Sequence, residues 1–219
     1  MMSSPDSQAQ KPTRFKFRTL TAKPETLTAD FLPHSKGRCH ERESTVAIGL
    51  PFEAVRRDCY MDNGDGTVTV LNLSLRPTNA PAGFRQPTLK PKTEFYKTEQ
   101  GYVYMGTGEI GGTVDWQPVI KIGAKQGDTW DHEHEGIRTL YKLNVILNAT
   151  GEALRASVGL GADGHLWTAA VEARSEIGGK RYKTLYTLGY NIGLMRKEMY
   201  EAVDDSSKIR LLDELKSVK

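Results

Sequence analysis

Long apolar runs are missing from this chain of 219 residues. The stretch from Leu143 to Leu147 is among the longest, and Asn144 interrupts it, so we predict no transmembrane helix. The first residues also lack the apolar segment that a signal peptide needs. The chain as given is therefore expected either to be cytoplasmic or to have lost a leader.

Strong net charge is also missing. Lys and Arg together number 30 and Asp and Glu 27, which gives a formal net charge of +3. No basic run is interleaved with aromatic residues, so the composition argues against a nucleic-acid partner.

Cysteine is scarce, with Cys39 and Cys59 as the two examples in the chain. Two cysteines are too few for a Cys-based zinc site. Both fall in neighbouring candidate strands, which allows a disulfide if the protein is exported. The sequence alone favours two small buried thiols.

Alternating segments and turn signals make up most of what is present. Asp62 to Gly66 and Gly178-Gly179 supply residues that adopt positive φ angles in tight hairpins. The predicted strands cover residues 38–48, 53–61, 67–75, 93–97, 102–106, 116–122, 129–134, 137–148, 153–160, 165–176, 180–189 and 194–200. Residues 207–219 fit both a strand and a helical stripe, and we favour the strand because its neighbours are strands.

This spacing predicts a mainly β fold. We expect a curved antiparallel sheet, either a sandwich or a partly open barrel, built of sequential hairpins. Residues 1–30 are polar and contain several prolines, which predicts a flexible N-terminal arm. Residues 31–219 are then one β domain. A weak internal sequence repeat allows this domain to consist of two similar halves, 31–114 and 115–219.

The last third ends an aromatic-rich strand with a signature from Asn191 to Arg196. Asn191 is suited to a left-handed turn, and Gly193 to a bent or closely approached backbone. These residues carry no reactive group, so we interpret the signature as a structural corner of the sheet.

Three segments together resemble a family of bacterial exported and lipoprotein-type β domains of unknown function. They are Trp116-x-Pro118-x-Ile120-x-Ile122 with the following Gly127-Asp128-Thr129-Trp130, Leu166 to Ala173, and Tyr182 to Lys197 with its Asn-Val-Gly-Leu-Val-Lys-like ending. The resemblance implies a periplasmic or extracellular protein of the cell envelope. It further implies a non-enzymatic binding or structural role, with a concave sheet face for a small apolar ligand or a protein partner.

His132 and His134 form the best candidate metal pair, because alternate residues of a strand project from the same face. A third ligand is needed, and we consider His40, Glu41 and His165 for it. A solvated strand edge guarded by charges is the favoured interpretation. We therefore assign no catalytic, cofactor or metal residue, and keep a metal-binding protein or metal-dependent enzyme as the alternative function.

Other patterns predict structure and no chemistry. Asp62 to Gly66 lacks the downstream acidic residue of a calcium loop and is predicted to be a hairpin turn. Gly106 to Gly111 fits G-x-G-x-x-G, but no convincing helix follows, which argues against a dinucleotide site. Trp116, Trp130 and Trp167 are expected to fill the core and its rim.

Overall fold

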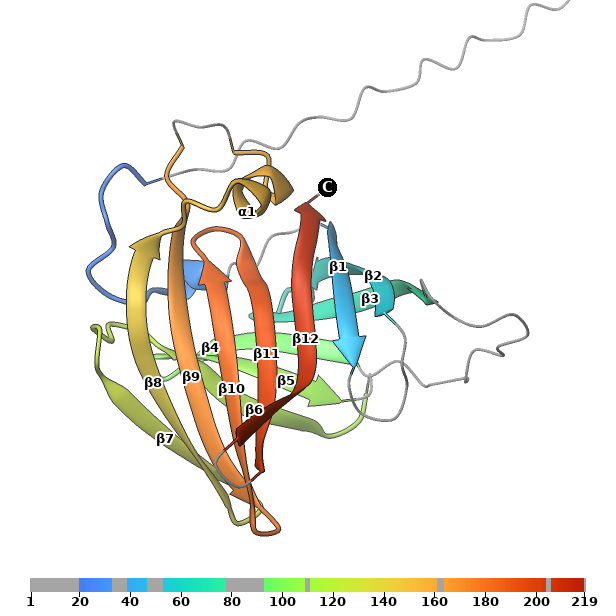
Figure 1. The fold of residues 1–219 in the computed structure, drawn as a ribbon, viewed down its shortest axis with the longest axis vertical. Coiled ribbons are helices and arrows are strands. Elements are labelled where there is room, and N and C mark those ends of the chain that lie inside the picture. Colours follow the sequence, from blue (N-terminus) through green and yellow to red (C-terminus); the bar gives the residue numbers. More distant parts are fainter. Residues whose placement is uncertain are drawn as a thin grey trace, which may run out of the picture.

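The protein is built around one sheet of twelve antiparallel strands that curves into a nearly closed barrel (Figure 1). The computed structural model describes residues 20–32, 39–46, 53–77, 93–108, 111–160, 164–203 and 206–218. Every recorded ladder is antiparallel, and most join strands that follow one another in the chain. The predicted mainly β fold of sequential hairpins is confirmed.

The sheet consists of two meanders of consecutive strands. The first meander contains β1 (Cys39–Val46), β2 (Glu53–Asp62), β3 (Thr67–Pro77), β4 (Thr93–Glu99), β5 (Tyr102–Gly108) and β6 (Val114–Lys121). The second contains β7 (Thr129–His134), β8 (Ile137–Asn148), β9 (Trp167–Ile177), β10 (Lys180–Gly189), β11 (Gly193–Val203) and β12 (Ser206–Val218). In Figure 1, β8 to β12 stand in front and the strands of the first meander curve behind them. Whether the chain divides into two similar halves stays a prediction.

The meanders meet at two places that differ in kind. At the first, β1 and β12 form an antiparallel ladder from His40 opposite Val218 to Val46 opposite Leu211, with a shift of register between Glu41 and Arg42. At the second, β6 and β7 are the two ends of the sheet, with no ladder recorded between them. We call the first place the β1/β12 junction and the second the β6/β7 seam.

The turns that the sequence singles out behave as predicted. In the β2–β3 hairpin, the Asp62 carboxylate accepts a hydrogen bond from the Gly64 amide at 2.8 Å. Asn191, between β10 and β11, has a φ of 57°, and Gly193 has a φ of 97°. Both angles lie in the left-handed region, so this signature is a structural corner. Because β5 ends at Gly108 and β6 begins at Val114, no helix follows the glycine-rich stretch.

One predicted strand is wrong. Residues 153–160 do not form a strand, because Glu152–Ser157 form the short helix α1. Glu, Ala, Leu and Arg in this segment are strong helix formers, and their propensity outweighs the weak alternation. The helix stops where Gly159 turns the backbone with a φ of 68°. The C-terminal segment, by contrast, is the strand β12 that the sequence favoured.

An N-terminal strap, residues 20–32, packs against the barrel and includes the 3-10 helix η1 (Ala29–Phe31). Leu27 and Phe31 are fully buried in the main apolar cluster. The Leu27 amide donates to the Ala124 carbonyl at 2.8 Å, and the Asn191 amide donates to the Asp30 carbonyl at 2.8 Å. Within the predicted arm, Leu27 is therefore anchored in the core while residues 21–23 are exposed, and residues 1–19 lie outside the described part of the chain.

The concave side of the sheet is filled with side chains. Buried residues from both meanders form one apolar cluster, including Val70, Val103, Tyr141, Val171 and Leu188. A smaller cluster near α1 contains Val158, Leu166, Met195 and Leu215. Among the helices that the structure describes, none is long and apolar enough to cross a membrane.

Candidate functional site

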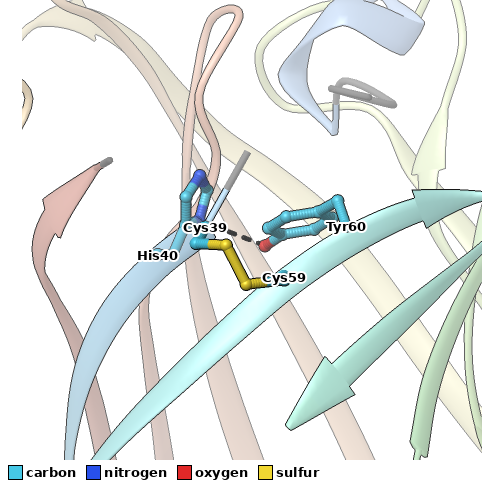
Figure 2. Close-up of a disulfide and its surroundings, with 4 residues drawn as sticks. All are labelled: Cys39, His40, Cys59 and Tyr60. Carbon is cyan, nitrogen blue, oxygen red and sulfur yellow. Dashed lines mark hydrogen bonds between the residues drawn. A yellow bond between two sulfur atoms is a disulfide. The ribbon is translucent and has the colours of Figure 1, made fainter. Parts of the chain in front are cut away.

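A disulfide joins Cys39 of β1 to Cys59 of β2 (Figure 2). The two residues are direct partners in the antiparallel ladder, which is what brings their side chains together on one face. The expectation of two buried free thiols is therefore wrong. The sequence allowed the disulfide, but its spacing could not establish that the two strands pair in this register.

The next residue of each strand points to the opposite, inner face. His40 follows Cys39 and Tyr60 follows Cys59, and the Tyr60 hydroxyl lies 3.2 Å from His40 Nδ1 (Figure 2). Tyr60 in turn stacks on Tyr96 of β4 at a centroid distance of 6.1 Å. Burial, reinforced by the neighbouring Glu94 carboxylate, raises the pKa of Tyr96 well above its usual value.

Arg42 lies two residues further along β1 and is 1% exposed. Its Nε donates to Asp213 Oδ2 of β12 at 3.0 Å, and its Nη1 donates to the Leu194 carbonyl of β11. One guanidinium thus ties three neighbouring strands from inside the barrel. Asp213 is 171 residues away in the sequence, and no sequence signal that we used pairs it with Arg42.

These buried groups, together with Asp58 opposite His40 in the ladder, form the inner polar cluster: His40, Arg42, Asp58, Tyr60 and Asp213. Each residue is at most 8% exposed. The cluster contains imidazole, carboxylate and phenol groups, the usual parts of acid–base chemistry. The cluster is buried inside the barrel, and the hydrogen bonds of Arg42 join β1 to β11 and β12. Its position therefore suits a role in holding strands together.

The β6/β7 seam is bridged by side chains. The Trp130 indole N–H donates to the Pro118 carbonyl at 2.7 Å, which supplies the donor that a backbone N–H would supply in a ladder. Further along, His134 Nε2 lies 3.4 Å from Asp115 Oδ1. These contacts hold β6 beside β7, although no ladder of backbone hydrogen bonds is recorded between the two strands.

The predicted histidine pair is at this seam. The rings of His132 and His134 are nearly parallel, with centroids 6.4 Å apart, as same-face residues of a strand should be. Asp115 is the acidic neighbour that the structure brings to them, and the sequence did not single it out. Over the described ranges, no group of three or more His, Cys, Asp or Glu side chains is arranged to hold a metal ion.

The three ligands proposed to complete that site lie elsewhere. His40 and Glu41 are on β1, which five strands of the second meander separate from β7 in the sheet order. His165 lies beside Asn148 at one end of β8, with its Nδ1 3.1 Å from the Asn148 amide nitrogen. His132 pairs with Thr139 near the other end of β8. Nine residues of strand between Thr139 and Asn148 correspond to roughly 30 Å.

Tyr141 of β8 lies next to the seam. It stacks on Trp130 with the rings 6° from parallel and 5.7 Å apart. The side chain is fully buried, and its hydroxyl makes no hydrogen bond to any described residue. Burial, with smaller effects of Tyr186 and Asp115, raises the pKa of Tyr141 far above its usual value, so it is a neutral phenol. Its interior position in a strongly alternating strand was the one available sequence signal.

Comparison with known proteins gives two structural neighbours. One is a putative lipoprotein from Parabacteroides distasonis, with a TM-score of 0.44 and 13% sequence identity, covering 86% of this chain and 98% of that one. The other is a putative exported protein with a YmcC-like fold from Bacteroides fragilis, with a TM-score of 0.43 and 12% identity over the same shares. No family model matches the chain, and no curated protein matches it in sequence.

Proposed function

We propose that the protein is an exported, non-enzymatic module of the cell envelope that binds a ligand or partner. The observation that carries the proposal is the Cys39–Cys59 disulfide. Disulfides persist in oxidising compartments and are rare in the reducing cytosol. The location is therefore periplasmic or extracellular, the location that the sequence resemblance implies.

The non-enzymatic part of the proposal rests on access to the chemical groups. His40, Arg42 and Asp58 are each about 1% exposed. A substrate would have to part the sheet to reach them. Acid–base catalysis needs its groups within hydrogen-bond reach of the reacting atoms, and these groups are engaged inside the barrel.

The packed interior also changes where binding takes place. The resemblance implied a concave face open to an apolar ligand, yet the described residues on that face are buried against one another. A ligand or partner is therefore expected at the outer face or at the β6/β7 seam.

The compartment and thiol state test this proposal together. Cells that make the protein are lysed in acid, and free thiols are then labelled with a maleimide polymer that slows migration on a gel. We expect protein from the envelope fraction to gain label only after reduction, and a Cys39→Ser variant to gain one label without reduction. Cytoplasmic protein that gains two labels without reduction would refute the exported assignment.

A further inference from the structure

We propose that the outer face of β4, β5 and β6 is a binding site for a carboxylated saccharide, a chain that contains uronic acid. We call this surface the aromatic platform and define it by Phe95, Lys97, Tyr104 and Trp116. The site rests on the proposed function and gives the binding module a ligand class. Its three strands are neighbours in the sheet, and their outer face is turned away from β8 to β12 (Figure 1).

Strand alternation places the platform side chains on one face. Tyr96 of β4 is buried in the core, so its neighbours Phe95 and Lys97 point outward. Lys97 lies opposite Tyr104 in the β4–β5 ladder. The rings of Phe95 and Trp116 have centroids 6.3 Å apart. All four platform residues are partly exposed, so a ligand in solution can reach them.

Gly106 of β5 makes room for the Trp116 ring against the sheet. This glycine is the ladder partner of Phe95 on one side and of Trp116 on the other. A Cβ atom at position 106 would stand 2.8 Å from Cε3 of Trp116, which is closer than such atoms approach. The missing side chain therefore leaves the space that the indole occupies.

The Lys97 ammonium is held at one place on the platform. Its nitrogen lies 4.8 Å from the centroid of the Trp116 ring and 5.1 Å from that of the Tyr104 ring. It also lies 2.7 Å from Glu99 Oε2. The cation–π contacts fix the position of the charge. The ion pair is at the surface, where such pairs contribute little, so the carboxylate of a ligand can take the place of Glu99.

The charges of this face favour an anionic ligand. Lys121 is opposite Tyr102 in the β5–β6 ladder, on the same outer face, and adds a second positive charge. Lys97 and Lys121 together outnumber the single carboxylate of Glu99. A carboxylate of the ligand would accept a charge-assisted hydrogen bond from the fixed ammonium of Lys97.

The rings select a saccharide among the anions. The face of an aromatic ring carries negative charge, which attracts the positively polarised C–H groups of a sugar ring. A uronic acid has these C–H groups and a carboxylate in one unit. One such unit can therefore place its carboxylate at Lys97 while its ring packs on Trp116.

Isothermal titration calorimetry on the full chain tests the site with tetramannuronate and tetragalacturonate. The methyl ester of each has the same rings without the charge and is the matched ligand. We expect at least one acid to bind, and its ester to bind about tenfold more weakly or less. Added salt should weaken the binding of the acid and not that of the ester.

Side-chain replacements locate the binding. Lys97→Met keeps a long apolar side chain over the rings and should lower affinity for the acid about tenfold, with no effect on the ester. Glu99→Gln should raise affinity for the acid. Trp116→Ala should abolish binding of both ligands, with circular dichroism to check that it is folded. Lys183→Met is the matched control, because Lys183 lies 4.8 Å over the Tyr200 ring in the second meander, and binding should be unchanged.

Three results would overturn the proposal: no binding of either acid, equal affinity for acid and ester, or equal losses in Lys97→Met and Lys183→Met. Cosedimentation with phosphatidylglycerol vesicles that Trp116→Ala abolishes, without sugar binding, would also overturn it and assign the platform to a membrane surface. None of these results affects the thiol-labelling test, so failure of this site is distinguishable from failure of the exported assignment.

Discussion

The two places where the meanders meet are built on opposite principles. At the β1/β12 junction a ladder of backbone hydrogen bonds is reinforced inside by Arg42 and Asp213, and outside by Lys216, which lies 2.8 Å from Glu43. The hydrogen bond to Glu43 is the main cause that raises the pKa of Lys216. At the β6/β7 seam, bridging side chains take over the role of the ladder.

The difference shows which contacts have to be strong. Strands at the β1/β12 junction are far apart in the sequence, so closing this contact costs chain entropy that packing must offset. Strands at the seam are joined by the short connection after Lys121, and their proximity is enforced by the chain. The junction therefore stabilises the closed sheet, whereas the seam depends on a few side-chain contacts between strands that the chain already holds close together.

The largest effect is expected from breaking the junction from inside. Arg42→Ala leaves Asp213 as a buried charge without its guanidinium, and such losses cost about 3–5 kcal/mol. Urea unfolding should show this decrease in stability. Arg138→Ala removes the exposed ion pair with Asp131 beside the seam and should cost at most about 1 kcal/mol. Equal losses in the two variants would contradict the contrast between junction and seam.

Opening the disulfide should have the next largest effect. The Cys39→Ala/Cys59→Ala variant frees β1 from β2 beside the junction, and we expect it to lose about 3 kcal/mol of stability. Reduction of the unchanged protein should lower Tm in the same way, while leaving the Tm of the double variant unaltered. A reductant effect of equal size in both proteins would show that the disulfide is not its cause.

The corner at Gly193 sharpens the comparison further, because it precedes the residue whose carbonyl binds Arg42. Valine is disfavoured at a φ of 97°, so Gly193→Val should cost about 1–3 kcal/mol. Gly136→Val, in the β7–β8 turn with a φ of 76° and open space around it, controls for the backbone strain alone. A smaller loss at Gly193 than at Gly136 would mean that the corner does not support the junction.

At the seam, Trp130→Phe removes the indole donor to the Pro118 carbonyl. A hydrogen bond of this kind contributes about 1 kcal/mol, and the smaller ring adds a modest packing loss. Amide exchange should speed up in β6 and β7 and stay unchanged in β1 and β12. Trp116→Phe, on the outer face of β6, serves as the control. Faster exchange at both meeting places would mean that the sheet opens as a unit.

The smallest effect is expected from His132→Ala/His134→Ala. Both histidines are at least partly exposed at an unzipped edge, so stability should change by no more than about 0.5 kcal/mol. A chelator should leave Tm unchanged. Stoichiometric zinc or copper in the purified protein, or a large drop of Tm on chelation, would instead make the metal-binding alternative the leading function.

The sequence by itself determined the β class, most strand positions and the corner at Asn191 and Gly193. These features depend on alternation and on local φ preferences, which neighbouring residues carry. Where propensity was mixed, as in residues 153–160, the local signal was misinterpreted, because helix formers occupied an apparently alternating segment.

Only the tertiary structure decided which side chains of different strands contact one another. It placed Asp213 on Arg42, Cys39 opposite Cys59 and Asp115 beside His134, contacts that depend on strand order and register. Register changes which residues are neighbours without altering the alternation that predicts each strand. The sequence could therefore predict His132 and His134 as candidate site residues. Asp115 and the buried Tyr141 could be placed at the seam only from the assembled strands β6, β7 and β8.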